Sequence, residues 1–188
     1  MRDPAYWLEQ LKVWGVLREG HFLLTSGRHS NRFLLFAPAF SQPSAAEELG
    51  RAIAEQFEGQ EIETVVGPAM GGVILAHEVA RALGVRSIYA EKAGEGMALK
   101  RGFALRPGER VLVVEDAVST GGSVQKVLDI CEQARAAVQG VGIIADRTGG
   151  QVDLGVPLKA LLTLEVPSYP ADACPLCREG RPLERPKS

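Results

Sequence analysis

Short continuous runs of apolar residues alternate along this chain with stretches in which apolar residues recur every three or four positions. The runs predict buried strands at the start of 63–76 and at 85–90, 111–114, 141–145 and 158–166. Helical spacing is found at 44–57 and 124–137. Strands that alternate with helices predict an α/β fold with a mainly parallel central sheet flanked by helices, and ligands bound above the carboxyl ends of the strands.

Local signals add detail at the beginning of the chain. Asp3 followed by Pro4 predicts the start of a first helix. Two apolar runs within 20–36, separated by a turn of Ser, Gly and Asn, predict a β-hairpin. The series Ser44–Glu47 matches a capping box, which predicts that the next helix begins there.

The stretch 111–123 combines a strand, two acids and a glycine-rich loop before a helix. Backbone N–H groups at such a helix start attract anions, and Gly121 and Gly122 let the backbone approach a phosphate closely. Glu115 and Asp116 would repel a phosphate unless they face sugar hydroxyls or a metal ion. An ordinary strand–turn–helix corner is the simpler interpretation, but the acid pair favours a ribose phosphate, which offers both hydroxyls and an anion.

Charge and length exclude some classes of function. Lys plus Arg is 21 and Asp plus Glu is 23, so the net charge of −2 offers no general attraction to nucleic acid or membranes. A chain of 188 residues fits one domain. The N-terminal pattern is typical of neither a signal peptide nor a transmembrane helix, so we expect a cytoplasmic protein.

The three cysteines do not make a disulfide framework. Cys174 and Cys177 have metal-ligand spacing, but a structural zinc ion requires four ligands and the sequence shows one such pair. The interpretation favoured by the sequence is a pair of reduced or disulfide-linked tail thiols, with a zinc site shared across a dimer as the alternative.

The strand, the two acids and the Thr-Gly-Gly-Ser loop of 111–123 resemble the phosphoribosyl-diphosphate signature of type I phosphoribosyltransferases. A second segment is similar to the N-terminal motif of orotate phosphoribosyltransferases: Phe22, the turn Ser26-Gly27-Arg28-His29-Ser30 and the aromatic Phe33. Some members have a lysine where this chain has Thr25.

This resemblance implies a type I phosphoribosyltransferase-like fold in a single domain, 1–188, with segments 1–40 and 165–188 contributing a small hood and the tail. It implies Mg-dependent transfer of ribose 5-phosphate from phosphoribosyl diphosphate to orotate, a pentosyltransferase reaction of pyrimidine (UMP) biosynthesis. Mg²⁺ would be bound mainly by the diphosphate, with no protein ligand assigned directly. The expected assembly is a homodimer with shared active sites.

The resemblance also implies roles for individual residues. The groups expected to bind phosphoribosyl diphosphate are Glu115, Asp116, Ala117, Val118, Ser119, Thr120, Gly121, Gly122, Ser123, Met70, Gly71, Lys92, Lys100 and Arg101. Those expected to face orotate are Ser119, Arg147 and Phe33, and those expected to be catalytic are Lys92, Lys100 and Asp116. The residues alone also allow a packing role for Phe33, a surface ion pair for Arg147 and a solvated excursion for 91–103.

Two other functions remain open at this stage. A purine phosphoribosyltransferase would share the core but should lack the Ser26-Gly27 motif. A non-catalytic regulator that senses phosphoribosyl diphosphate and binds RNA or DNA would need a basic face, which the net charge does not suggest.

Overall fold

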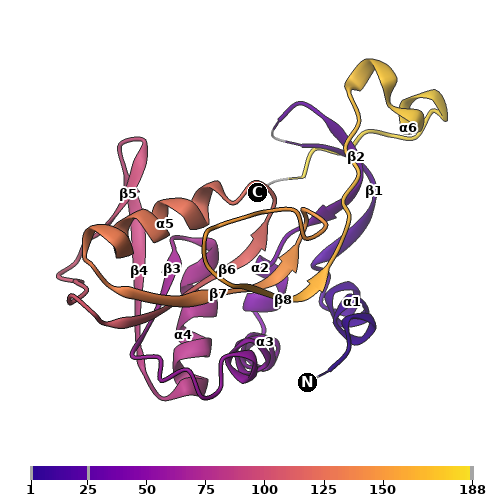
Figure 1. The fold of residues 1–188 in the computed structure, drawn as a ribbon. Coiled ribbons are helices and arrows are strands. Elements are labelled where there is room, and N and C mark those ends of the chain that lie inside the picture. The colour runs from indigo at the N-terminus through magenta and orange to yellow at the C-terminus, as the bar shows by residue number, and fades with distance from the viewer. Residues whose placement is uncertain (1, 25, 187–188) are drawn as a thin grey trace.

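A six-stranded sheet forms the centre of the molecule in the computed structural model, which describes residues 2–24 and 26–186 (Figure 1). The strand order is β5-β4-β3-β6-β7-β8, and every neighbouring pair is parallel except β4 and β5. The strands are β3 (Thr64–Pro68), β4 (Arg86–Ala93), β5 (Gly96–Leu99), β6 (Arg110–Val118), β7 (Ala137–Asp146) and β8 (Leu158–Thr163). The predicted α/β class with a mainly parallel sheet is confirmed.

Alternate residues of the central strand β6 enter two separate cores. Leu112 and Val114 pack with α1 (Pro4–Val13), α3 (Pro43–Gln56) and α4 (Gly71–Leu83). Val111 and Val113 pack on the opposite face with α5 (Gly122–Gln133). This period of two follows from the pleat of a strand, and it explains why a strand buried on both faces is a continuous apolar run.

A two-stranded hairpin stands apart from the sheet (Figure 1). Its strands, β1 (Leu17–Leu23) and β2 (His29–Leu34), are antiparallel and confirm the predicted hairpin, while Thr25 lies outside the described residues. The chain then passes through α2 (Ala37–Phe40) to the sheet.

The C-terminal segment returns to this hairpin after β8, through a 3-10 turn at Ala171–Ala173 and the short helix α6 (Pro175–Arg178). His29 and Tyr169 exchange two backbone hydrogen bonds, of 2.8 and 2.7 Å. Leu23 N donates to Glu184 O, and Glu184 N donates to His21 O. We call β1, β2 and residues 165–186 together the hood.

Two local predictions change in detail. The capping box at Ser44–Glu47 is wrong, because α3 begins at Pro43, whose ring presets helical φ and places Ser44 inside the first turn. The segment 91–103 contains an ordered hairpin, since β4 continues to Ala93 and pairs with β5.

The buried carboxylate Glu109 joins the amino ends of three strands. It accepts hydrogen bonds from Thr64 Oγ1, Arg86 Nη2 and the Arg106 backbone N–H. Burial by itself would raise the pKa of Glu109, but these hydrogen bonds and the Arg86 charge outweigh it and lower the pKa to about 2. Glu109 therefore stays ionised and stabilises the sheet at the end opposite the predicted ligand site.

Within the described residues, no helix is long and apolar enough to cross a membrane.

Candidate active site

The acid pair lies towards the carboxyl end of β6, beyond the last residue of β6 that pairs with β3. The pairing of β3 with β6 ends at Val66 and Val113, whereas β7 follows β6 as far as Val118. Glu115 and Asp116 therefore face the loop that follows β3. This is the edge at which parallel α/β sheets bind their ligands.

Glu115 is 7% exposed, and its surroundings disfavour its charge. Burial raises the pKa of Glu115 to about 8, the nearby Asp116 carboxylate adds to the shift, and the Asp116 backbone N–H opposes it. A hydroxyl donor or a cation brought to Glu115 would favour the ionised form, so the position suits a polar ligand.

Asp116 and Arg147 form a second charged group at the same edge. Burial raises the pKa of Asp116, while a hydrogen bond from the Ala117 backbone and the positive charge of Arg147 oppose the rise. Burial lowers the pKa of Arg147, and Asp116 partly offsets that effect. Among the described residues, the buried Nε of Arg147 has no hydrogen-bond partner. The guanidinium therefore has donor capacity for an anionic ligand.

The loop after the acid pair leads into α5 through Gly121, whose φ is +79°. No side chain of the described residues caps this helix start, so its first N–H groups are open to an anion. A small cavity of about 60 Å³ is lined here by Glu115, Ala117, Val118, Ser119, Thr120, Gly121, Gly122, Ser123 and Val124. The predicted phosphate loop thus surrounds one hollow beside the acid pair.

The loop after β3 approaches the acids from the neighbouring strand. A Cβ added at Gly71 would lie 2.8 Å from Asp116 Oδ2 and 3.5 Å from Glu115 Oε1. A cis peptide bond joins Ala69 to Met70, whose side chain is 84% exposed. Because Gly71 also begins α4, the open ends of two helices meet the two carboxylates.

The predicted basic residues lie on the outer edge of the sheet. Lys92, Lys100 and Arg101 are exposed, on or just after the β4–β5 hairpin. Lys100 Nζ donates to Lys92 O at 2.7 Å, and Arg101 Nε donates to Glu91 at 2.6 Å. None of the described hydrogen bonds or ion pairs joins these residues to the acid pair.

Phe33 lies in the hood rather than at the strand ends. Its ring packs 5.8 Å from the ring of Phe22, within the hairpin. This contact gives Phe33 the packing role that the sequence left open, and its contribution to a base pocket stays a prediction.

Sequence reasoning missed two residues that shape the site. Asp146 is buried and accepts hydrogen bonds from the backbone N–H groups of Thr148 and Gly150, which fixes the turn that includes Arg147. Thr148 also lines an open cavity of about 350 Å³ with Ser119, Thr120, Gln151 and Val152. The charged pair at the end of β7 was the available signal for Asp146, whereas Thr148 had none.

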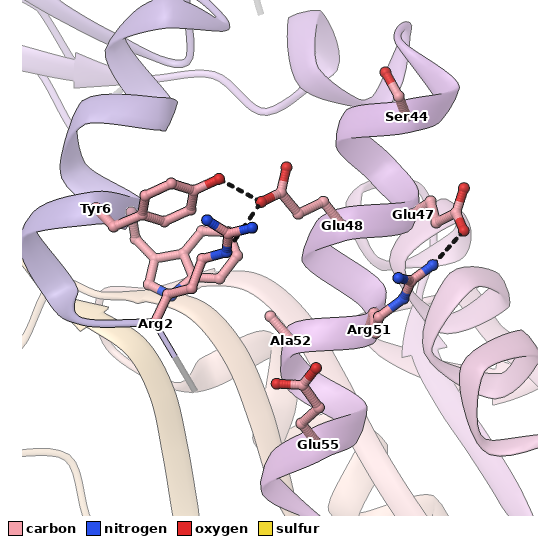
Figure 2. A pocket seen from close by; sticks show the side chains of 9 residues that line it. Arg2, Tyr6, Ser44, Glu47, Glu48, Arg51, Ala52 and Glu55 are labelled. Atoms are coloured by element: carbon pink, nitrogen blue, oxygen red, sulfur yellow. Dashed lines mark hydrogen bonds and ion pairs between the residues drawn. The ribbon is translucent and has the colours of Figure 1, made fainter.

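A larger cavity, of about 590 Å³, lies elsewhere, between α1 and α3 (Figure 2). Two of its three carboxylates already have partners: Glu48 accepts from Tyr6 Oη, and Glu47 accepts from Arg51 (Figure 2). No glycine lines this cavity, whereas the strand ends combine a glycine-rich loop with a buried acid pair, so we assign the ligand site to the strand ends.

Comparison with known proteins assigns the family. Residues 40–165 match the model of the phosphoribosyl transferase domain. An orotate phosphoribosyltransferase of Caldanaerobacter subterraneus is 48% identical over 181 residues, which cover 96% of this chain and 95% of the relative. The chain belongs to the orotate phosphoribosyltransferase family. Another relative of that name, from Thermotoga maritima, is 49% identical over 180 residues and 96% of both chains.

Solved structures show that phosphoribosyltransferases named for other bases share the fold of the orotate phosphoribosyltransferases. The orotate phosphoribosyltransferase of Aeropyrum pernix aligns with a TM-score of 0.71 at 26% identity, covering 83% of this chain and 92% of that one. An adenine phosphoribosyltransferase of Rhodothermus marinus aligns with a TM-score of 0.69 at 25% identity, covering 85% and 99%. The fold alone therefore does not distinguish orotate from adenine.

Proposed function

We propose that this protein transfers ribose 5-phosphate from phosphoribosyl diphosphate to orotate, giving orotidine 5′-monophosphate and diphosphate in pyrimidine synthesis. The observation that supports the choice of orotate is the high identity to orotate phosphoribosyltransferases over nearly the whole chain, hood included. The adenine enzymes are similar at much lower identity.

The chemistry needs no strong nucleophile from the protein. The bond between the anomeric carbon and a diphosphate oxygen breaks, and its electron pair leaves with the diphosphate. A ring nitrogen of orotate forms the new bond and releases its proton to solvent. Positive charge develops on the sugar and negative charge on the leaving group, so catalysis depends on positioned charges and hydrogen bonds. In this proposal Glu115 and Asp116 accept hydrogen bonds from the ribose hydroxyls, and residues 117–123 bind the 5′-phosphate at the open end of α5.

Orotate recognition is proposed for Arg147 and Ser119. Orotate carries a carboxylate, and a guanidinium can donate two parallel hydrogen bonds to it. The unpartnered Nε of Arg147 and the position of this side chain beside Asp116 support that role.

The diphosphate is proposed to lie against Met70 and Gly71, with Mg²⁺ bound mainly through its oxygens. Carboxylate oxygens and substrate phosphates are the ligands that Mg²⁺ prefers, and Asp116 is the carboxylate nearest this loop. When bound, Mg²⁺ neutralises charge on the leaving diphosphate. Lys92, Lys100 and Arg101 would complete the site by movement of the β4–β5 hairpin, over the same subunit or its partner in a homodimer.

Reduced cysteines are compatible with a cytoplasmic location, which we also propose.

The decisive experiment measures the fall in orotate absorbance when the purified protein is mixed with Mg²⁺, phosphoribosyl diphosphate and orotate. Adenine, hypoxanthine and uracil are tested in parallel, and Asp116→Asn serves as the variant with a broken acid pair. We expect turnover with orotate alone and its loss in Asp116→Asn. Turnover of a purine alone would mean that the substrate is that purine and not orotate. Binding of phosphoribosyl diphosphate without turnover of any base would indicate a regulator.

A further inference from the structure

Four potential metal ligands converge in the hood, outside the site described above. His21 and His29 come from β1 and β2, and Cys174 and Cys177 flank the start and end of the Cys-Pro-Leu-Cys turn at α6. One ligand atom from each residue lies within 4.8 Å of all the others. The proposed reaction uses none of these side chains.

The spacing of the ligand atoms resembles the edges of a tetrahedron. His21 Nε2 lies 3.0 Å from His29 Nδ1 and 3.5 Å from Cys174 Sγ. Cys177 Sγ lies 3.7 Å from His21 Nε2 and 3.3 Å from His29 Nδ1. Around a zinc ion with ordinary Zn–N and Zn–S bond lengths, the edges are about 3.4 Å between two nitrogens and about 3.6 Å between nitrogen and sulfur. The four atoms are therefore already near the positions that a shared ion requires.

The other nitrogen of His21 has the partner expected of a metal ligand. Its Nδ1 lies 2.9 Å from the Arg181 carbonyl oxygen, to which an Nδ1–H donates. That hydrogen bond leaves a lone pair on Nε2, which faces the cluster. A histidine bound to a metal commonly donates its second ring N–H to a backbone carbonyl in this way.

Burial also favours a closed structural site. His21, His29 and Cys174 are buried, and Cys177 is exposed. Apart from the His21 bond to Arg181 O and the contact between the two imidazoles, these buried polar groups have only weak hydrogen bonds to sulfur. A set of two nitrogens and two sulfurs with no open position is typical of structural rather than catalytic zinc.

We propose that these four side chains bind one Zn²⁺ ion, which cross-links the C-terminal segment to the β1–β2 hairpin. The sequence favoured plain thiols because it shows one pair of ligands near the C-terminus. The second pair lies far earlier in the chain, with His29 145 positions before Cys174, and the backbone hydrogen bonds of the hairpin with Tyr169 and Glu184 bring the two pairs together. Both cysteines are free, as ligands must be.

The first test measures metal in the wild-type protein. The full chain is produced with zinc in the medium, without a histidine tag and without chelators, and its metals are quantified by mass spectrometry. We expect about one zinc per chain, as for a closed four-ligand site. A strong chelator should remove it with a fall in melting temperature, and Zn²⁺, but not Mg²⁺, should restore the original value.

Cobalt substitution tests the ligand set. Co²⁺ added to the chelator-treated protein should give the visible absorption bands of tetrahedral Co²⁺ with thiolate ligands. His29→Ala and Cys177→Ser should lose zinc and these bands. The chain offers matched controls in His77→Ala, an exposed histidine on α4, and Cys131→Ala, a buried thiol on α5, both of which should keep them.

Two results would overturn the proposal. One is a wild-type chain that contains no zinc and whose melting temperature is unchanged by stoichiometric Zn²⁺, which would identify a hydrogen-bonded cluster without metal. The other is zinc binding that survives in both ligand variants. Neither result depends on the phosphoribosyltransferase reaction, so the two proposals fail independently.

Discussion

Glu115 illustrates at the scale of one residue how burial changes the protonation of the candidate site. Because the pKa of Glu115 is raised, the folded protein keeps a proton on this carboxyl between about pH 4.5 and about pH 8, whereas the unfolded chain has released it. The sign follows from linkage: this contribution to stability is complete below pH 4.5, declines as the pH rises through that interval, and is lost above about pH 8. A ligand that donates hydrogen bonds to the carboxylate would reverse this effect.

Glu115→Gln should therefore be more stable than the wild type at pH 8 in the absence of substrate, because the amide never becomes charged. The advantage should shrink as the pH is lowered towards 4.5. Chemical denaturation at a series of pH values measures the difference, with Glu95→Gln, in the exposed turn of the β4–β5 hairpin, as the control. Parallel stability curves for Glu115→Gln and the wild type would contradict the assignment.

Arg147→Ala should weaken orotate binding far more than binding of phosphoribosyl diphosphate. Loss of a hydrogen-bonded charged partner costs about 1.5–3 kcal/mol, which corresponds to a roughly 10- to 100-fold weaker affinity for orotate. Calorimetric titration with each substrate measures the two affinities, and Arg51→Ala, on the outer surface of α3, is the control. An equal loss of affinity for both substrates would show that Arg147 is not part of the orotate site.

At the scale of an element, the turn before α5 tolerates few substitutions. Gly121 has a φ of +79°, and a Cβ there would lie 3.0 Å from Leu154 Cδ2 and 3.1 Å from Val152 Cγ2. Both the backbone and the neighbouring side chains therefore require glycine.

Gly121→Ala should destabilise the protein by about 1–2 kcal/mol, since a left-handed conformation is unfavourable for a residue with a Cβ. For a chain of this size the melting temperature should fall by about 2–8 °C. Gly122→Ala is the matched control, because its φ is not in the left-handed region and its nearest neighbour would be 3.7 Å away. Scanning calorimetry measures both, and equal melting temperatures would show that the turn can relax.

The elements that the sequence predicted well are those defined by local chemistry. The run before Glu115 is apolar on both faces because β6 is buried on both faces, and the glycines after it are needed where the backbone turns into α5. The start of α3 was misplaced because two local signals competed, and Pro43 acts one residue before Ser44. The β4–β5 hairpin was open to two interpretations because β5 has only four residues and the segment before it, 91–95, is mostly charged.

What the sequence could not predict depends on distant contacts. The orphaned Nε of Arg147 and the turn held by Asp146 follow from where β7 ends beside β6. The cluster that includes His29 and Cys174 forms only because the C-terminal segment folds back onto the N-terminal hairpin, which no local pattern predicts. Residues 92, 100 and 101 lie away from the acid pair, so any role in catalysis depends on a movement that sequence patterns do not describe.

At the scale of the whole molecule, the distance of the basic hairpin residues from the acid pair makes subunit sharing testable. If the hairpin of one subunit closes over the site of the other, a Lys92→Ala/Lys100→Ala chain and an Asp116→Asn chain can complement each other. A hybrid dimer would then contain one intact site and one site with both defects.

Co-expression of the two inactive variants should restore about a quarter of wild-type activity, since about half of randomly formed dimers are hybrids with one intact site each. Light scattering should first confirm a mass of twice the 20.2 kDa chain. Each variant alone is the control. No recovery in a proven hybrid would mean that each hairpin serves its own subunit.

The return of the C-terminal segment to the hairpin also has a consequence for the order of events during synthesis. Residues 17–34 emerge from the ribosome early, but their hydrogen-bonding partners Tyr169 and Glu184 emerge only after all six strands of the central sheet. Contacts between segments so far apart in the chain form slowly, whereas β3, α4 and β6 are close in sequence and can pair as they emerge. The nascent chain can therefore pair β3 with β6 before it has a finished hood, and its earliest strands wait longest for their final neighbours.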